Sequence, residues 1–172
     1  NVPFDARPFS VEMPEKPEGA EWSPAFEYVT ETRYQADGSG ILDPAYSHIF
    51  VVPAEGGTPR QLTAGNYNHR SSLSWTPDSR EIFFSANRNE NWALQSRESD
   101  IFAVSKNGEL RQLTAIPGVE TGPRVSPDGT LIAYGKTDNE KLAYRNRYLH
   151  VIGIDGENDR NLSAGIDNSV SG

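Results

Sequence analysis

The sequence predicts an all-β protein built from repeated units of four short antiparallel strands. The motif R-Q-L-T at Arg60–Thr63 returns at Arg111–Thr114 and, as R-N-L-S, at Arg160–Ser163. The copies lie about 50 residues apart, a period typical of stacked supersecondary units. Runs rich in Ile, Phe, Tyr and Val alternate with Pro, Asn, Asp and Gly turn signals, and no window has a helical apolar period. Four antiparallel strands per repeat indicate the blades of a β-propeller.

Two units can be followed strand by strand. The expected strands of the first are Ser74–Thr76, Glu81–Ala86, Asp100–Ser105 and Leu110–Thr114, and those of the second start at Val125 and continue at Thr130–Gly135, Tyr148–Ile154 and Asn161–Ser163. Pro77-Asp78-Ser79 and Pro127-Asp128-Gly129 predict the same turn, in which Ser79 fits the left-handed position less well than Gly129. Tight hairpins are predicted at Asn107-Gly108 and Asp155-Gly156.

The repeat divides the chain into an N-terminal segment and an incomplete propeller of three to four blades. Residues 1–25 hold five of the 12 prolines and predict an extended segment. Blade units are expected at about 26–63, 73–114 and 124–163, with the start of another at 164–172. The first unit contains an alternating strand at Phe26–Tyr34 and further strands at His48–Pro53 and Arg60–Thr63. Closed propellers need four to eight blades, so we expect a portion of a longer propeller or one that associates.

Composition excludes several classes of function. The 172 residues carry 24 Asp and Glu against 16 Lys and Arg, a net charge of −8, which disfavours nucleic-acid binding. No apolar run is long enough for a membrane helix, and without cysteine there are no disulfides or thiolate sites. Residues 155–166 lack two required positions of a calcium loop, so we expect a hairpin turn there, no metal site and no cofactor. Both cytoplasm and periplasm remain open as compartments.

Two motifs carry a family resemblance. S-P-D-G-T-L-I-A-Y at Ser126–Tyr134 and W-T-P-D-S at Trp75–Ser79 resemble TolB-type propellers and the N-terminal propeller of the prolyl oligopeptidase family of serine peptidases. Three further stretches, Glu31–Gly40, Tyr144–His150 and Leu162–Val170, are similar to the acylaminoacyl-peptidase and dipeptidyl-peptidase branch. The resemblance implies a propeller that gates or orients peptide substrates for an α/β-hydrolase domain.

The catalytic half of such an enzyme is missing from the sequence. The nucleophile of that family lies in Gly-x-Ser-x-Gly, and here the glycines at that spacing, Gly118 and Gly122, enclose Glu120. We therefore assign no catalytic residue and expect the hydrolase domain of the same parent chain as a partner. The alternative is a TolB-like interaction propeller that binds proteins or peptides. The sequence that follows Gly172 in the parent gene would separate the two.

The long loops between second and third strands hold the candidate contact residues. Trp92 is an aromatic residue in a polar loop, where it either contacts substrate or the hydrolase domain or packs on its own blade. Arg97 and Glu98 beside it share this status, as do Tyr144, Arg145 and Arg147 in the equivalent loop.

Two expectations concern contacts between blades and between chains. Arg60, Arg111 and Arg160 recur in register, and we expect each to pair with an acid of a neighbouring blade. Open end blades also predict self-association, forming a homo-oligomer.

Overall fold

The computed structural model describes residues 14–21, 23, 29, 31–42, 45–69, 72–139 and 145–170, and it forms two compact units, Asn1–Ala45 and Tyr46–Gly172. The described part of the first unit contains one antiparallel hairpin, β1 (Gln35–Ala36) and β2 (Gly40–Ile41). The strand predicted at Phe26–Tyr34 falls mostly outside the described residues, and residues 31–34 form no strand.

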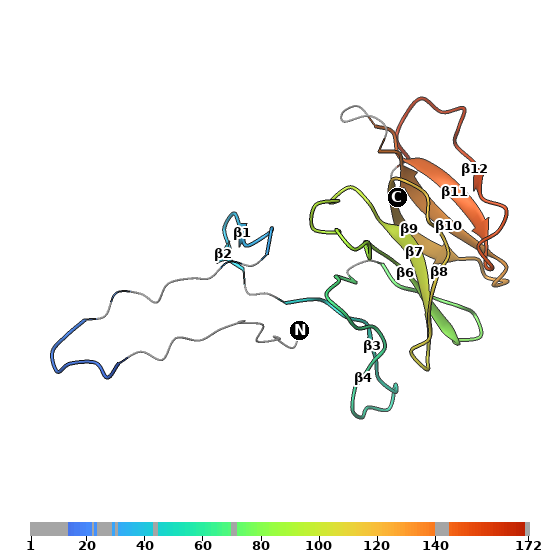
Figure 1. The fold of residues 1–172 in the computed structure, drawn as a ribbon. Helices are drawn as coiled ribbons and strands as arrows, with labels where there is room; N and C mark the ends of the chain where they lie inside the picture. The colour runs from blue at the N-terminus through green and yellow to red at the C-terminus, as the bar shows by residue number, and fades with distance from the viewer. Residues whose placement is uncertain are drawn as a thin grey trace. The chain divides into compact units, whose positions relative to one another are not determined.

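The second unit is a partial propeller of antiparallel sheets (Figure 1). Blade 1 consists of β3 (Phe50–Val51) and β4 (Arg60–Gln61). Blade 2 consists of β5 (Ser74–Trp75), β6 (Glu81–Ala86), β7 (Asp100–Ser105) and β8 (Leu110–Gln112). Blade 3 consists of β9 (Val119–Val125), β10 (Leu131–Thr137), β11 (Tyr148–Gly153) and β12 (Arg160–Asn161). In blades 2 and 3 the strand order follows the chain. The described residues contain no helix, and therefore none that could cross a membrane.

The predicted all-β repeat is confirmed, with one correction in blade 3. Its first strand was expected from Val125, but β9 already begins at Val119. Gly122, with φ of +64°, and the buried Pro123 interrupt the strand, and the register to β10 shifts there. A bulge that contains Gly and Pro reads as a turn in sequence, which concealed the first half of this strand.

The repeated leucine occupies the same backbone position in all three blades. The amide of each leucine donates to a carbonyl on the neighbouring strand segment, in each case at 2.8 Å. The pairs are Leu62 to Ile49, Leu113 to Ile101 and Leu162 to Leu149. The next residue accepts the amide hydrogen of that same residue: Thr63 Oγ1 from Ile49 at 2.9 Å, Thr114 Oγ1 from Ile101 at 2.8 Å and Ser163 Oγ from Leu149 at 2.8 Å. This closing pattern confirms that one structural position is used three times.

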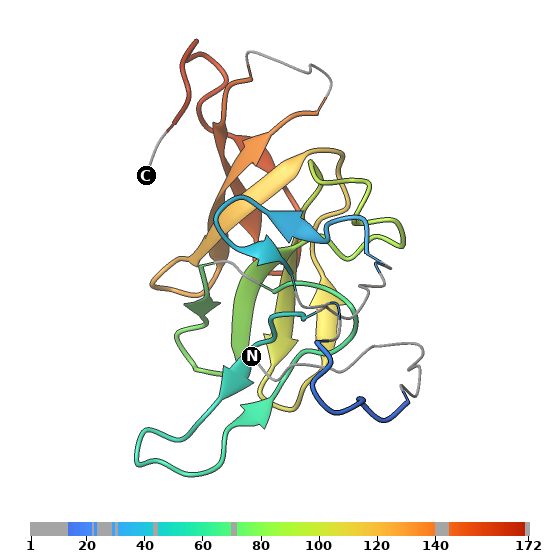
Figure 2. The ribbon, with the colours of Figure 1, turned by 90° about the vertical axis from the view of Figure 1, so that its left-hand side faces the viewer.

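The apolar core lies between successive blades, whose sheets are neighbours in Figure 2. Each blade has a leading face toward the preceding blade and a trailing face toward the following one. The first junction joins Ile49 and Leu62 of blade 1 to Ile82, Phe84, Ala86, Phe102 and Val104 of blade 2. The second junction joins Phe83, Ile101 and Ala103 of blade 2 to Ile132, Tyr134 and Ile152 of blade 3, with Leu113 packed against it. Burial of these faces stabilises the stack by about 25 cal/mol per Å² of apolar surface.

The recurring aspartates have the structural role predicted for them. Asp78 Oδ1 accepts hydrogen bonds from Thr76 Oγ1 at 2.6 Å and from the Arg80 amide at 3.1 Å, and Asp128 makes the equivalent bonds with Ser126 and Thr130. Asp155 Oδ1 accepts from the Glu157 amide, which confirms a hairpin turn at the calcium-like segment. These carboxylates order tight turns.

We predicted that the recurring arginines pair with an acid of a neighbouring blade. The acceptor in that prediction is wrong, but Arg60 and Arg111 do connect neighbouring blades. Arg111 forms a bidentate ion pair with Glu81 of its own blade, at 3.0 Å for both bonds. Its Nη2 also donates to Ile154 O in the β11–β12 turn of the next blade, at 3.1 Å. Arg60 likewise donates to Lys106 O in the β7–β8 turn. Arg60 and Arg111 thus link blades 1 and 2 to the hairpin of the following blade through a carbonyl rather than an acid.

Candidate functional site

A polar cleft lies beside the long loop of blade 2 and has a volume of about 360 Å³. Its lining residues come from the β6–β7 loop, the start of β7, β8 and the link to β9; they are Asn89, Glu90, Asn91, Gln95, Glu98, Asp100, Gln112, Ala115, Ile116 and Pro117. Three of the ten are acidic, and four carry neutral side-chain amides that can both donate and accept hydrogen bonds. We call this the loop cleft.

Local hydrogen bonds shape the loop that forms one wall of the cleft. Asn87 Nδ2 donates to Gln95 O at 2.6 Å, which closes the loop across its base. Consecutive turns are held by amides that donate three residues back, from Trp92 to Asn89 and from Gln95 to Trp92. Asparagine side chains favour such turns because they bond nearby backbone groups. The asparagine-rich sequence of the loop therefore yields an ordered wall.

Glu98 fastens the loop to blade 3. Its Oε2 accepts the Gly118 amide hydrogen at 2.9 Å, and its Oε1 accepts from Asn139 Nδ2. The adjacent Ser99 forms a parallel bridge to Val119, in which its amide donates to Gly118 O and its carbonyl accepts from the Glu120 amide, both at 3.0 Å. The Glu98 carboxylate is consequently held in a fixed position at the cleft wall.

Two further carboxyl groups near the cleft are perturbed by burial. Burial, and then the neighbouring Glu98, raise the pKa of Asp100 to about 6. Burial raises the pKa of Glu120 to about 7, against the hydrogen bond from Thr114 Oγ1 that lowers it. Glu120 is fully buried, and its Oε1 has no hydrogen-bond partner among the described residues. Asp100 lines the cleft, whereas Glu120 lies behind it in the second junction.

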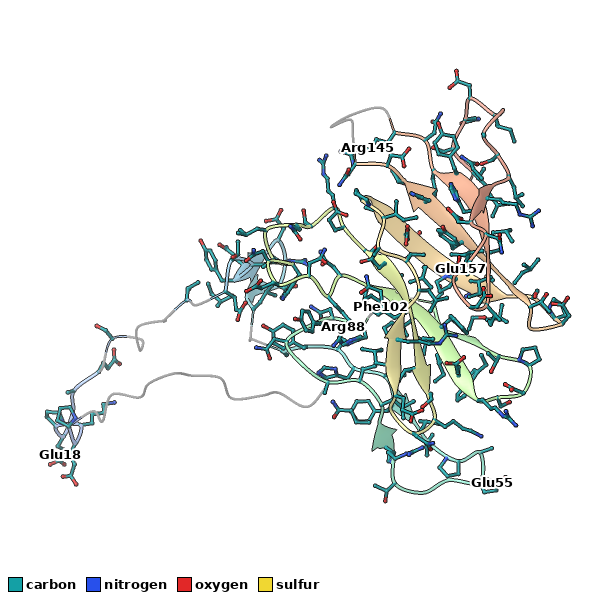
Figure 3. The ribbon with its side chains drawn as sticks, turned by 45° about the vertical axis from the view of Figure 1, so that its right-hand side comes forward. Glu18, Glu55, Arg88, Phe102, Arg145 and Glu157 are labelled. Carbon is teal, nitrogen blue, oxygen red and sulfur yellow. The ribbon has the colours of Figure 1, made fainter. Side chains whose placement is uncertain are left out.

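A second polar cluster lies at the first junction. Arg88 extends over the rings of Tyr67, at 4.6 Å, and Phe102, at 5.9 Å (Figure 3). Its Nη1 lies 2.6 Å from His69 Nε2, and His69 Nδ1 lies 3.0 Å from Ser47 O. Burial, offset in part by the Ser47 bond, lowers the pKa of His69 to about 4. The imidazole is therefore neutral, with Nδ1 donating to the carbonyl and Nε2 accepting from the guanidinium.

Of the predicted contact residues, Glu98 lines the cleft, whereas Trp92, Arg97 and Arg145 are not among its lining residues. Trp92 is half-buried and packs edge-on against Tyr46, in the segment before β3, with ring centroids 6.0 Å apart. Arg97 is exposed on the same loop. Arg145 is half-buried in the equivalent loop of blade 3, between β10 and β11 (Figure 3). Tyr144 lies outside the described residues.

Sequence reasoning singled out Glu98 but not Asp100, Glu120 or the pair of His69 and Arg88. Asp100 begins a predicted strand and Glu120 stands between two glycines, so neither forms a spaced motif. Their perturbation comes from packing between blades, which no local pattern encodes. Within the described ranges, no group of three or more His, Cys, Asp or Glu residues is placed to hold a metal ion.

Comparison with known proteins links the chain to a described family. The family model of the dipeptidyl peptidase IV (DPP IV) N-terminal region matches residues 20–121. An uncharacterized protein of Agrobacterium fabrum is 30% identical over 93 residues, which make up 53% of this chain and 28% of that protein.

Solved structures of TolB proteins share the fold. One, assigned as TolB from Agrobacterium tumefaciens, superposes with a TM-score of 0.54 at 20% identity over 67% of this chain and 40% of its own. TolB from Acinetobacter baumannii gives a TM-score of 0.52 at 17% identity over 67% of this chain and 26% of its own. The chain therefore spans less than half the length of each of these relatives.

Proposed function

The chain belongs to the dipeptidyl peptidase IV N-terminal region family, and from this premise we propose that it is the propeller portion of a prolyl oligopeptidase-family serine peptidase. In this role the propeller orients or filters peptide substrates for an α/β-hydrolase domain of the same parent protein. The supporting observation is the family match over residues 20–121, which includes blade 2 and all lining residues of the loop cleft.

The chemistry of the loop cleft favours a peptide with a free amino group. Glu98 and Asp100 are two carboxyl groups on one wall, and Glu98 is already fixed by the Gly118 amide. A peptide ammonium carries three donors and a positive charge, so carboxylates held in place can bind it at little ordering cost. Ile116 and Pro117 supply apolar surface for the adjoining side chain. This favours a dipeptidyl-peptidase-like enzyme over an acylaminoacyl-peptidase-like one, whose substrates have a blocked amino group.

Peptide titration tests this proposal. We expect short peptides with a free amino terminus to bind the chain, and their N-acetylated forms to bind at least tenfold more weakly because an ammonium is lost. Glu98→Gln should weaken binding of the free peptide. Glu109→Gln, on the exposed β7–β8 turn, is the matched control and should leave it unchanged. Equal binding of free and acetylated peptides would contradict the role of the cleft.

A second candidate is a TolB-like interaction propeller, and the two TolB structures that share the fold favour it. The parent gene distinguishes the candidates. A following domain of alternating strands and helices with Gly-x-Ser-x-Gly supports the peptidase. Further blade repeats without such a domain support the interaction propeller.

A further inference from the structure

The wall of the loop cleft is attached to blade 3 by a short set of backbone and side-chain hydrogen bonds. The Ser99 amide donates to Gly118 O, and the Glu120 amide donates to Ser99 O, both at 3.0 Å. Ser99 Oγ adds two bonds, because it donates to Glu120 O at 2.8 Å and accepts from the Glu120 amide at 3.0 Å. We call these contacts between Ser99 and residues 118–120 the wall latch.

The first junction has the equivalent backbone bond with a different side chain. There the His69 amide donates to Ser47 O at 2.9 Å, as the Glu120 amide donates to Ser99 O. Both ring nitrogens of His69 have a partner, Nδ1 the carbonyl of Ser47 and Nε2 the guanidinium of Arg88. The repeat therefore places a titratable side chain at this point in both junctions, and in the first junction both of its polar atoms are satisfied.

In the second junction one carboxyl oxygen of Glu120 has no such partner. Glu120 is fully buried. Thr114 Oγ1 accepts the Ile101 amide hydrogen at 2.8 Å, and its own hydrogen goes to Glu120 Oε2. Oε1 makes no hydrogen bond with the described residues. An ionised carboxylate spreads its charge over both oxygens, so ionisation in this place would bury charge on an atom that has no donor.

The charged groups around Glu120 do not compensate an ionised carboxylate. Asp100 on β7 and Asp159 in the β11–β12 turn both face it and repel a negative charge. Lys136, its partner across β9 and β10, attracts one but donates no hydrogen bond to Oε1. The Tyr134 hydroxyl on β10 donates to Asp159 at 2.8 Å. Two negative groups therefore oppose one positive group, and this balance favours a protonated Glu120.

We propose that the proton on Glu120 holds the wall latch closed. While the carboxyl is neutral, the first residues of β9 remain in the junction and the bonds to Ser99 are intact. When the carboxyl ionises, Glu120 moves from the junction toward solvent, because water supplies the donors that Oε1 lacks. Its backbone moves with it, so the bonds to Ser99 break and the cleft wall separates from blade 3.

The direction of the response follows from proton linkage. Burial raises the pKa of Glu120 from 4.5 to about 7 in the closed latch, whereas a solvated carboxyl in the open latch has its ordinary pKa. The closed latch therefore binds the proton more tightly, and it is lost as pH rises through about 7. These pKa values give an increase of about tenfold in the ratio of open to closed molecules from pH 6 to pH 8.

Amide hydrogen exchange of the full chain, followed residue by residue by NMR, tests the proposal. After correction for intrinsic exchange rates, the protection factors of the Ser99 and Glu120 amides should fall by about tenfold from pH 6 to pH 8. Unchanged protection at both amides would overturn the proposal.

Low concentrations of urea distinguish a local opening from unfolding of the whole chain. Local opening exposes little surface, so exchange at Ser99 and Glu120 at pH 8 should not depend on urea. The Leu62 amide, which donates to Ile49 O in the first junction, is the internal reference for unfolding. Exchange at the latch amides with the urea dependence of Leu62 would refute a local latch.

Glu120→Gln assigns the pH response to one carboxyl. This variant does not titrate, so the protection of the Ser99 amide should be equal at pH 6 and pH 8. Asp100, whose pKa is about 6, is unchanged in it and serves to exclude the other buried acid. Glu109→Gln, on the exposed β7–β8 turn, is the matched control and should retain the tenfold fall. A fall of the same size in Glu120→Gln would overturn the proposal.

The unmodified chain supplies a second measurement should Glu120→Gln fail to fold by circular dichroism. Carbon-13 NMR of the Glu120 carboxyl follows its titration directly. A midpoint at about 7 supports the latch, and a midpoint at the ordinary value of 4.5 would overturn it. Because the wall itself is observed, these results do not depend on the peptide role proposed for the loop cleft.

Discussion

The two blade junctions share their backbone contacts and differ in the polar groups that they bury. The first stacks Phe84 on Phe102, with ring centroids 5.9 Å apart, and adds a neutral His69 that contacts Arg88. The second buries Glu120, whose carboxyl accepts from Thr114, and next to it the hydroxyl of Tyr134 donates to Asp159 at 2.8 Å. The repeated backbone contacts therefore determine how neighbouring blades pack, whereas the polar side chains buried at each junction differ.

This difference gives the junctions opposite responses to pH. Folding lowers the pKa of His69 from 6.5 to about 4, so the first junction loses stability as pH falls through that range. Folding raises the pKa of Glu120 from 4.5 to about 7, so the second junction loses stability as pH rises through that range. The titrations of His69 and Glu120 therefore change the stability of the chain in opposite directions.

The largest expected effect comes from removing the aromatic centre of the first junction. Phe84→Ala leaves a cavity between blades 1 and 2 and should lower the free energy of unfolding by about 3–5 kcal/mol. Urea unfolding measures this change. Leu94→Ala, on an exposed loop, should change it by less than about 0.5 kcal/mol. Similar losses for both variants would show that the first junction does not hold the blades together.

Glu120→Gln should remove the loss of stability that the second junction shows as pH rises. Glutamine keeps an acceptor for Thr114 but never ionises, so the variant should be about 2 kcal/mol more stable than the parent at pH 8. At pH 4, where the parent carboxyl is protonated, the two chains should be nearly equal. Urea unfolding at both values measures the difference, and a gain independent of pH would assign the effect to packing.

His69→Gln should remove the loss of stability that the first junction shows as pH falls. Glutamine can still donate to Ser47 O and accept from Arg88, but it does not gain a proton. The parent should lose about 1–2 kcal/mol relative to the variant as pH falls from 7 to 4, because the buried imidazole must become charged. Thermal unfolding across this range detects the divergence. Parallel profiles for parent and variant would argue against a neutral His69.

The smallest expected effect compares the two equivalent turns. Ser79 has φ of +57°, and Gly129 has φ of +74° at the same turn position. Ser79→Gly should stabilise the chain by up to about 1 kcal/mol, since glycine adopts this conformation without Cβ strain, and Gly129→Ala should destabilise it by a similar amount. Chemical unfolding of the two variants measures both signs. Shifts in the same direction would mean that the turns are not equivalent.

Those features of the fold that repeat could be predicted from sequence. The motif around the repeated leucine recurs at a fixed period, and it therefore predicted one common structural position for Leu62, Leu113 and Leu162. The start of β9 could not be found, because Gly122 and Pro123 inside a bulge carry the same residue types as a turn. Repetition also suggested that the arginines link blades, but the carbonyl acceptors follow from backbone placement in the next hairpin.

The candidate site was less accessible to sequence reasoning. Trp92 and Glu98 stood out as an aromatic and an acid in a polar loop, and the structure turns Glu98 to the cleft and Trp92 to Tyr46. Nothing in the residue types distinguishes these two directions. The burial of Glu120 depends on how closely two blades approach, a property of tertiary packing.

The bridge between Ser99 and Val119 has a dynamic consequence for the cleft. The final residues of the loop are hydrogen-bonded to the first strand of the neighbouring blade. The wall can therefore move outward only when these backbone hydrogen bonds break. Deuterium uptake at the Glu120 and Ser99 amides therefore reports on the population of molecules in which the wall is open. A ligand that binds in the cleft and holds the wall closed would slow exchange at both amides together. Its binding could therefore be detected at Glu120, in the neighbouring blade.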